Sequence, residues 1–69
     1  MPTIKVIELI GTSSKSWEDA ANSAVKEAAE TINDITGLEV ISQTAKVDGG
    51  RIVEYRATVK AAFKVKSNR

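Results

Sequence analysis

The sequence contains no cysteine and no histidine among its 69 residues. The lack of cysteine excludes disulfides and thiolate metal sites, and the lack of histidine removes the commonest general base and the commonest ligand of transition metals. No apolar run approaches the roughly 18 residues of a membrane span, and no segment has the pattern of a signal peptide. We therefore expect a protein of the cytoplasm that is not an enzyme and does not act at a membrane.

Aromatic residues are also scarce, with one Trp, one Tyr and one Phe. They are not interleaved with basic residues and the net charge is only +1, so nucleic acid is not an expected partner. Three lysines and seven acids give residues 1–39 a charge of −4, whereas seven basic residues and two acids give residues 40–69 a charge of +5. This asymmetry indicates either ordinary solvated faces or a basic surface for an anionic ligand.

Residues 51–66 alternate between apolar and polar side chains, with few exceptions. The apolar set is Val53, Tyr55, Ala57, Val59, Ala61, Phe63 and Val65. Because the side chains of a strand point alternately to opposite faces, this pattern predicts one long strand with a buried face and a hydrated face. At about 3.3 Å per residue, such a strand spans roughly 50 Å.

Two further strands are predicted. Residues 3–10 are β-branched and apolar on both faces, which predicts a strand that is covered on both sides and ends at Gly11. Residues 38–47 predict another strand, apolar at first and polar later. The Asp48-Gly49-Gly50 segment is typical of a tight turn, so we expect it to join this strand to the long one as an antiparallel hairpin.

Residues 15–34 have a helical period. Ser13, Ser14 and Ser16 are candidate N-caps, and Ser16 has the capping-box spacing to Asp19. Alanine fills the centre of the apolar face, so the helix can lie close to a sheet. A helix of about 20 residues is about 30 Å long and cannot cover a strand of roughly 50 Å. We therefore expect part of the sheet to contact another copy, and oligomerisation to stabilise so small a domain.

Few side chains suggest chemistry. Trp17, at the start of the helix on its apolar face, is interpreted as a packing residue rather than a ligand platform. Asp48 is interpreted as a turn residue, because calcium requires about six to eight oxygen donors. An ion site formed by carboxylates of several copies that meet on a symmetry axis is left as an open alternative. Asp34 and Glu39 lack a partner nucleophile or metal cluster, so we interpret them as cap and surface groups.

Pro2 raises one enzymatic alternative. Small β-α-β enzymes of the tautomerase group also begin with Met-Pro, and they use the free amino-terminal proline as a base. In this sequence Met1 precedes Pro2, and a proline nitrogen acylated by Met1 is not a basic amine. The tautomerase interpretation also leaves the long last strand unexplained.

Several short segments together carry a family resemblance. They are Val6-Ile7-Glu8-Leu9-Ile10-Gly11-Thr12-Ser13, Ser16-Trp17, Ala20-Ala21, Leu38-Glu39-Val40, Tyr55-Arg56-Ala57-Thr58-Val59 and Ala62-Phe63. In this order and chain length they resemble the dodecins over residues 3–66. The resemblance implies an α+β fold of order β-α-β-β, with a three-stranded antiparallel sheet wrapped around one helix, as a single domain over residues 1–69. It also implies a hollow shell of twelve copies that stores flavins, stacked in pairs near three-fold axes.

Two positions differ from the flavin site of the family. Gly37 stands where flavin-binding dodecins carry a Trp, and Arg56 stands where they carry a Gln after the Tyr of the third strand. The Trp gives the isoalloxazine an aromatic face, whereas Gly37 has no side chain; a Gln both donates and accepts hydrogen bonds, whereas Arg56 only donates. Gly37, Arg56 and Lys46 are therefore the candidate ligand-binding positions, for a flavin (riboflavin, FMN or FAD) or for bound ions.

Charge adds a further expectation. Twelve copies of Arg56, Lys60, Lys64 and Lys46 would form a large basic face, which would prefer anions such as phosphorylated cofactors if it lines the lumen. The leading interpretation is a shell that binds and stores a small ligand, with flavin implied by the resemblance. The alternatives are a structural or ion-binding shell without flavin and, third, the tautomerase. The expected partners are further copies of the chain and a small-molecule or ion ligand.

Overall fold

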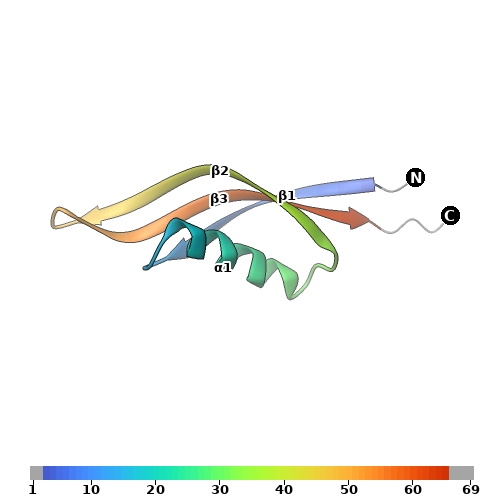
Figure 1. The fold of residues 1–69 in the computed structure, drawn as a ribbon, viewed down its shortest axis with the longest axis horizontal. Helices are drawn as coiled ribbons and strands as arrows, with labels where there is room; N and C mark the ends of the chain where they lie inside the picture. Colours follow the sequence, from blue (N-terminus) through green and yellow to red (C-terminus); the bar gives the residue numbers. More distant parts are fainter. Residues whose placement is uncertain (1–2, 66–69) are drawn as a thin grey trace.

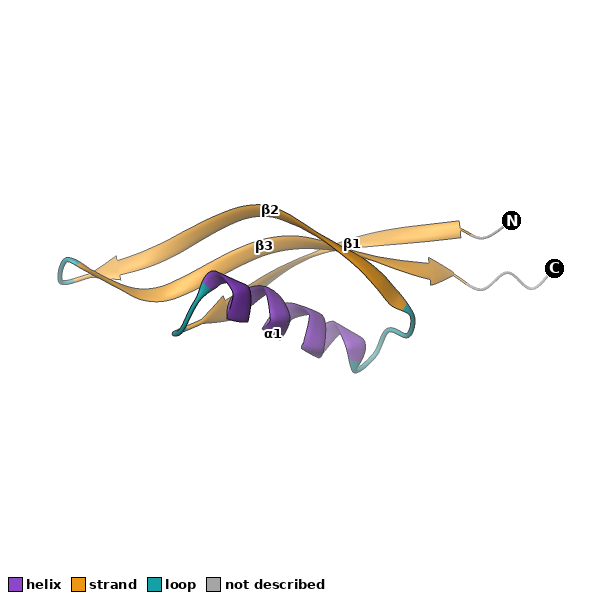
Figure 2. Cartoon of the chain, in the orientation of Figure 1, coloured by secondary structure: helices purple, strands orange, loops and turns teal. Residues whose placement is uncertain are grey.

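The computed structural model describes residues 3–65, which form three strands and one helix in the order β-α-β-β (Figure 1). β1 spans Thr3–Ser13, α1 spans Trp17–Ala29, β2 spans Ile35–Asp48 and β3 spans Arg51–Val65. The strands form one antiparallel sheet in the order β1-β3-β2, with β3 in the centre. The helix packs on one side of this sheet, mainly against β1 and β3 (Figure 2). These observations confirm the predicted fold class.

The alternation predicted for β3 is confirmed beneath the helix. Ala57, Val59 and Ala61 are fully buried there, whereas Val53, nearer the hairpin turn, is 42% exposed. The 13 residues of α1 extend about 20 Å, and the 15 residues of β3 extend about 50 Å. The helix therefore covers only the middle of the strand, and the molecule is an elongated body of 56 × 20 × 12 Å.

β1 continues through Gly11 to Ser13, so the prediction that Gly11 ends the strand is wrong. Gly11 is buried, and a Cβ atom at this position would overlap the carbonyl oxygen of Ala20 in α1. The missing side chain is thus what allows the helix to lie directly on β1. Pairing with β3 is unbroken along the whole of β1.

The start of α1 is held by three side chains. The hydroxyl of Ser16 accepts a hydrogen bond from the Asp19 backbone N–H at 3.0 Å, which confirms the predicted capping spacing. Ser13, the last residue of β1, donates its hydroxyl proton to the Asp19 carboxylate at 2.7 Å and accepts from the Lys15 backbone N–H at 2.9 Å. These bonds satisfy free donors of the first helical turn and fix the path from strand to helix.

α1 ends at Ala29, five residues before the predicted end at residue 34. The Ile32 backbone N–H still donates to the carbonyl oxygen of Ala28 at 2.9 Å, but the chain then turns away. Asp34 has φ at 64°, a left-handed conformation that aspartate tolerates better than most residues. β2 consequently starts at Ile35, earlier than the predicted residue 38.

The predicted hairpin is confirmed. Gly49 and Gly50 have φ of 61° and 76°, and the turn pairs Asp48 with Arg51. The hairpin projects past the start of α1, at the opposite end of the described residues from the start of β1 and the end of β3 (Figure 1). The predicted end of the long strand at residue 66 and Pro2 lie outside the described residues. Within residues 3–65 no helix is long and apolar enough to span a membrane.

Large apolar side chains remain exposed on both faces of the sheet. On β1, Ile4, Val6 and Ile10 lie opposite even-numbered residues of β3 and therefore point away from α1, with exposures of 50%, 55% and 65%. The other large exposed apolar residues are Leu38, Val40, Ile41, Val47, Ile52 and Val53. The composition of β1 predicts that both of its faces are covered. In the single chain only the face toward α1 is covered.

Candidate functional site

The side of the sheet opposite α1 is called the helix-free face. It comprises the even-numbered residues of β3 from Glu54 to Lys64 and the residues directly opposite them, because directly paired residues of antiparallel strands point to the same side. Arg56 belongs to this set, Gly37 lies opposite Ala62, and Lys46 lies opposite Glu54. All three predicted ligand-binding positions are therefore on the helix-free face.

One chain brings only two of these three positions together. The Arg56 Nε atom lies 2.9 Å from the Glu54 Oε1 atom, and Lys46 faces the same Glu54 from β2. Gly37 pairs with Ala62, six residues along β3 from Arg56, which is roughly 20 Å. A small ligand that touches both Gly37 and Arg56 must therefore lie between two copies of the chain.

The helix-free face carries the four expected basic residues, but acidic residues lie among them. Its basic residues are Lys46, Arg56, Lys60 and Lys64, and its acidic residues are Glu8, Glu39 and Glu54. Lys60 lies directly between Glu8 on β1 and Glu39 on β2. Four basic and three acidic side chains leave a net charge of +1, and oxygen donors alternate with amines across the face.

Glu8 and Glu39 were not recognised as members of this face from the sequence. Glu39 has a signal, because counting outward from the Asp48–Arg51 pair of the turn brings it opposite Lys60. Glu8 has no comparable signal, since no tight turn links β1 to β3 and the register of this pair depends on the packing of α1.

The aromatic side chains all lie on the side of the helix. The Trp17 and Tyr55 rings meet edge to face with centroids 4.8 Å apart, and the Trp17 indole N–H donates to the carbonyl oxygen of Thr44 at 2.8 Å. Phe63 shares its side of β3 with the buried Ala61. Trp17 thus packs against Tyr55 and the backbone of β2 within its own chain. Since the sequence has only these three aromatics, the helix-free face has none.

Gly37 is not required by packing within the chain. A Cβ atom there would meet only the Ala62 Cβ, at 3.8 Å, which is ordinary van der Waals contact. Val6 lies on the other side of Ala62, so Gly37 sits at the end of a short apolar row of Val6, Ala62 and Gly37. This part of the face is flat and open, and it has room for a larger side chain or for a ligand.

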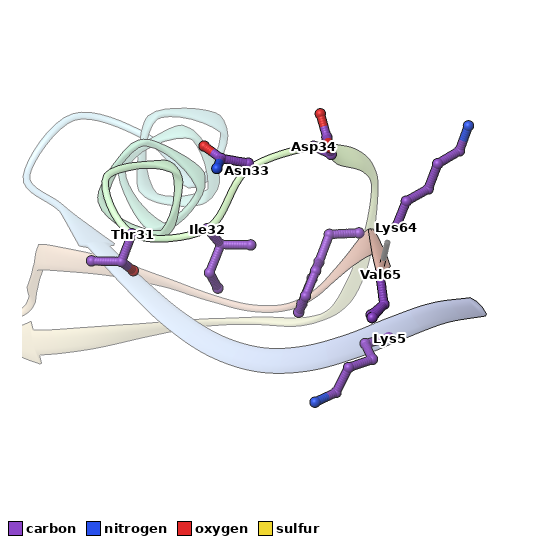
Figure 3. A pocket seen from close by; sticks show the side chains of 8 residues that line it. Lys5, Thr31, Ile32, Asn33, Asp34, Lys64 and Val65 are labelled. Atoms are coloured by element: carbon purple, nitrogen blue, oxygen red, sulfur yellow. The ribbon is translucent and has the colours of Figure 1, made fainter. Parts of the chain in front are cut away.

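A hollow of about 440 Å³ lies where the end of α1 faces the ends of β1 and β3 (Figure 3). It is lined by Lys5, Thr31, Ile32, Asn33, Asp34, Phe63, Lys64 and Val65. In Figure 3 the side chains of Lys5 and Lys64 point outward on opposite sides, so their ammonium groups do not converge. The carboxyl end of a helix also carries partial negative charge, which disfavours an anion in this hollow.

A second hollow, of about 330 Å³, lies between α1 and β2 and is called the α1–β2 groove. It is lined by Trp17, Glu18, Ala21, Asn22, Leu38, Val40, Gln43 and Ala57. The groove exists because α1 packs on β1 and β3 and scarcely touches β2. Neither hollow offers a metal cage: across residues 3–65 no three Asp or Glu side chains are grouped so that they could hold an ion.

Comparison with known proteins gives a consistent set of relatives. A family model described as Dodecin matches residues 3–66. The calcium dodecin of Mycobacterium tuberculosis is 41% identical over 66 residues, which cover 96% of this chain and 93% of the relative. Its crystal structure, described as that of a calcium-chelating antigen with a novel calcium-binding site, has a TM-score of 0.81 and covers 97% of this chain and 96% of that chain.

Likeness in shape does not follow sequence identity among these relatives. The dodecin of Streptomyces coelicolor is 24% identical with a TM-score of 0.93, and it covers 97% of this chain and 96% of that chain. A Thermus thermophilus protein, also 24% identical, has a TM-score of 0.94 and covers 99% and 100%. At this identity the likeness bears on the fold alone, and the fold agrees over almost the whole length of both chains.

Proposed function

This chain belongs to the dodecin family, and from that membership we propose that it forms a closed homo-oligomeric shell of twelve copies that binds and stores a small ligand. The proposed role is binding rather than catalysis, exercised in the cytoplasm by residues 1–69 as one domain. The support is the apolar surface that a single chain leaves exposed on both faces of its sheet, which a shell of equivalent copies would cover.

The proposed ligand is calcium or a similar divalent cation rather than a flavin. The observation that carries this choice is the position of the three aromatic side chains, all on the side of α1. The helix-free face, with Gly37, Arg56 and Lys46, therefore offers no ring for an isoalloxazine to stack on. It offers carboxylate oxygens instead, which are the donors that calcium prefers. The 41% identity to a protein called calcium dodecin supports the same choice.

The ion would be shared between copies. Calcium takes about six to eight oxygen ligands, and the described residues of one chain do not group three carboxylates. Glu8, Glu39 and Glu54 are the proposed donors, brought together where the helix-free faces of several copies meet. Lys60 lies between Glu8 and Glu39 and its positive charge opposes a cation at that point.

Calorimetric titration of the chelator-treated protein with calcium chloride tests this proposal. We expect Glu39→Gln to weaken calcium binding at least about tenfold, the scale of losing one charged donor, and Lys60→Gln to strengthen it. Glu27→Gln, on the exposed side of α1, is the matched control and should bind like the unaltered protein. Unchanged calcium binding in the Glu8→Gln, Glu39→Gln and Glu54→Gln variants would contradict the assignment.

Flavin is the second candidate, favoured by the open space beside Gly37 and by the family resemblance. Titration with riboflavin, followed by quenching of its fluorescence, separates the two ligands. We expect weak binding by the unaltered protein and tight binding by Gly37→Trp, because the indole would supply the missing stacking face. Gly37→Leu controls for bulk without an aromatic ring. Tight riboflavin binding by the unaltered protein, without calcium binding, would reverse the order of the two candidates.

A further inference from the structure

The α1–β2 groove is an apolar surface that the chain itself leaves open. Leu38 and Val40 form one wall and are 40% and 48% exposed, although they point to the same side of the sheet as the buried core. Trp17 forms the opposite wall, and Ala21 and Ala57 lie at its base. These side chains would be covered if α1 lay across β2, but α1 lies over β1 and β3.

The chain also carries an apolar projection without a cover. The hairpin arm is defined as residues 44–56, bounded by the Thr44–Arg56 pair, and it extends beyond the start of α1 (Figure 2). Val47, Ile52 and Val53 lie in this arm and are 61%, 45% and 42% exposed. α1 contacts only the base of the arm that is nearest to it, through Trp17 against Tyr55 and Thr44, and the rest of the arm extends past the start of α1 (Figure 1).

We propose that the hairpin arm of one copy occupies the α1–β2 groove of the next copy. The inference rests on the proposed assembly and names the contact that builds it. The arm is a two-stranded ribbon with apolar side chains, and the groove is a concave apolar surface on a different part of the same chain. Because the two surfaces differ, the contact is head-to-tail, and repeated contacts close into a ring when the rotation between copies permits.

Charge favours this pairing over contacts between like surfaces. α1 and its C-cap residue contain Glu18, Asp19, Glu27, Glu30 and Lys26, a net charge of −3. The hairpin arm contains Lys46, Arg51, Arg56, Asp48 and Glu54, a net charge of +1. Two helices placed side by side would repel each other, whereas a helix and an arm attract. The acidic Glu18 at the rim of the groove would face the basic side chains of the arriving arm.

The absence of native cysteine makes cross-linking the direct test. Asn22→Cys places a thiol at the rim of the groove, and Asp48→Cys places one at the tip of the arm; both positions are exposed. The two single variants are mixed, dissociated in denaturant, refolded together and treated with a short bismaleimide. We expect a covalent dimer that contains one chain of each variant, identified by an affinity tag on one of them.

The double variant Asn22→Cys/Asp48→Cys extends the test. It should give a ladder of covalent species under denaturing electrophoresis, and the double variant Asn22→Cys/Thr3→Cys, with its second thiol at the far end of β1, is the matched control. No excess of mixed dimers and no ladder beyond that of the control, in particles of unchanged native mass, would overturn the arm-in-groove contact while leaving the shell intact. A native mass of one chain would overturn both.

Discussion

The middle of the sheet and the hairpin arm have the same sequence pattern and opposite surroundings. Val59 lies in the middle of β3 and is fully buried beneath α1, whereas Val53, six residues nearer the hairpin turn on the same strand, is 42% exposed. The difference is that α1 covers the middle of β3 and does not extend to Val53. Alternation therefore predicts which side of a strand is to be covered, and the length of α1 decides how much of the cover comes from the same chain.

The largest expected effect on stability is that of replacing Gly11, and Gly37, the other glycine within a strand, is its control. Gly11→Ala places a methyl group against the Ala20 carbonyl, where neither backbone can move freely, so we expect a loss of about 3 kcal/mol in the free energy of unfolding. Gly37→Ala is the matched control, because its methyl group makes an ordinary contact with Ala62, and we expect a change of less than about 0.5 kcal/mol. Denaturant unfolding at fixed protein concentration measures both. Similar stability of the two variants would show that the close approach of α1 to β1 is not required.

Substitutions of two valines distinguish burial by the same chain from burial by another copy. Val59→Ala removes two buried methyl groups and should cost about 2 kcal/mol at every protein concentration. Val47→Ala removes methyl groups that are 61% exposed in the single chain, so it should act only through assembly. We expect its thermal midpoint to fall as the protein is diluted, because dissociation then contributes to unfolding. If Val47→Ala lowered the thermal midpoint equally at all protein concentrations, Val47 would be buried by its own chain and not by another copy.

The cap at the start of α1 is a smaller, local contribution. Ser16→Ala removes the acceptor for the Asp19 backbone N–H and should cost about 1 kcal/mol in the free energy of unfolding. Ser14→Ala, two residues earlier in the same exposed loop, should be neutral because Ser14 lies outside the cap. Equal costs for the two serines in denaturant unfolding would mean that loop composition, not the cap, stabilises the helix.

The ion pair on the hairpin arm has the smallest expected effect. Glu54→Gln removes the charge that faces Arg56 at 2.9 Å, yet the Arg56 and Glu54 side chains are 47% and 35% exposed. Exposed pairs contribute little, so we expect a change of less than about 0.5 kcal/mol in the free energy of unfolding, and a still smaller one at high salt. The pair lies on the side of the arm that faces away from α1. A larger loss that persists at high salt would show that this side of the arm, and not only its opposite side, is buried between copies.

The hairpin was predictable to within one residue, because β2 continues through Asp48, one residue past the predicted end. Asp48-Gly49-Gly50 demands positive φ angles at its glycines, which fixes the turn and, with it, the pairing of β2 with β3. Two register shifts, at Lys46/Val47 and at Val40/Ser42, cancel each other, so the simple count from the turn still holds at Glu39. Local turn chemistry was sufficient here because the two strands are adjacent in the sequence.

The end of α1 was not predictable from its period. Ile32 and Ile35 continue the apolar spacing of the helix, and no glycine or proline interrupts it after Ala29. The chain nevertheless leaves the helix there and returns along the edge of β3, with Asp34 supplying the reversal. Tertiary pairing of β2 thus outweighed local helical preference, which is a weak determinant near the end of a helix.

The candidate site was predictable in its face but not in its charge. Alternation along β3 places Arg56 on the side away from α1, and the count from the hairpin places Gly37 opposite Ala62 on that same side. The same count would pair Lys46 with Val53, and only the register shift at Lys46/Val47 brings Lys46 opposite Glu54. The balance between basic and acidic side chains depends in addition on β1, which supplies Glu8 and pairs with β3 although the two strands are far apart in the sequence. Long-range pairing of this kind leaves no local signal in the sequence.

The central claim is that other copies of the chain cover the parts of the sheet that α1 does not reach. Native mass determination of the purified protein at neutral pH and physiological salt tests it most directly. The account predicts a single closed species with the mass of twelve chains, and no detectable lone chain at micromolar concentration. A stable, folded single chain under those conditions would contradict it.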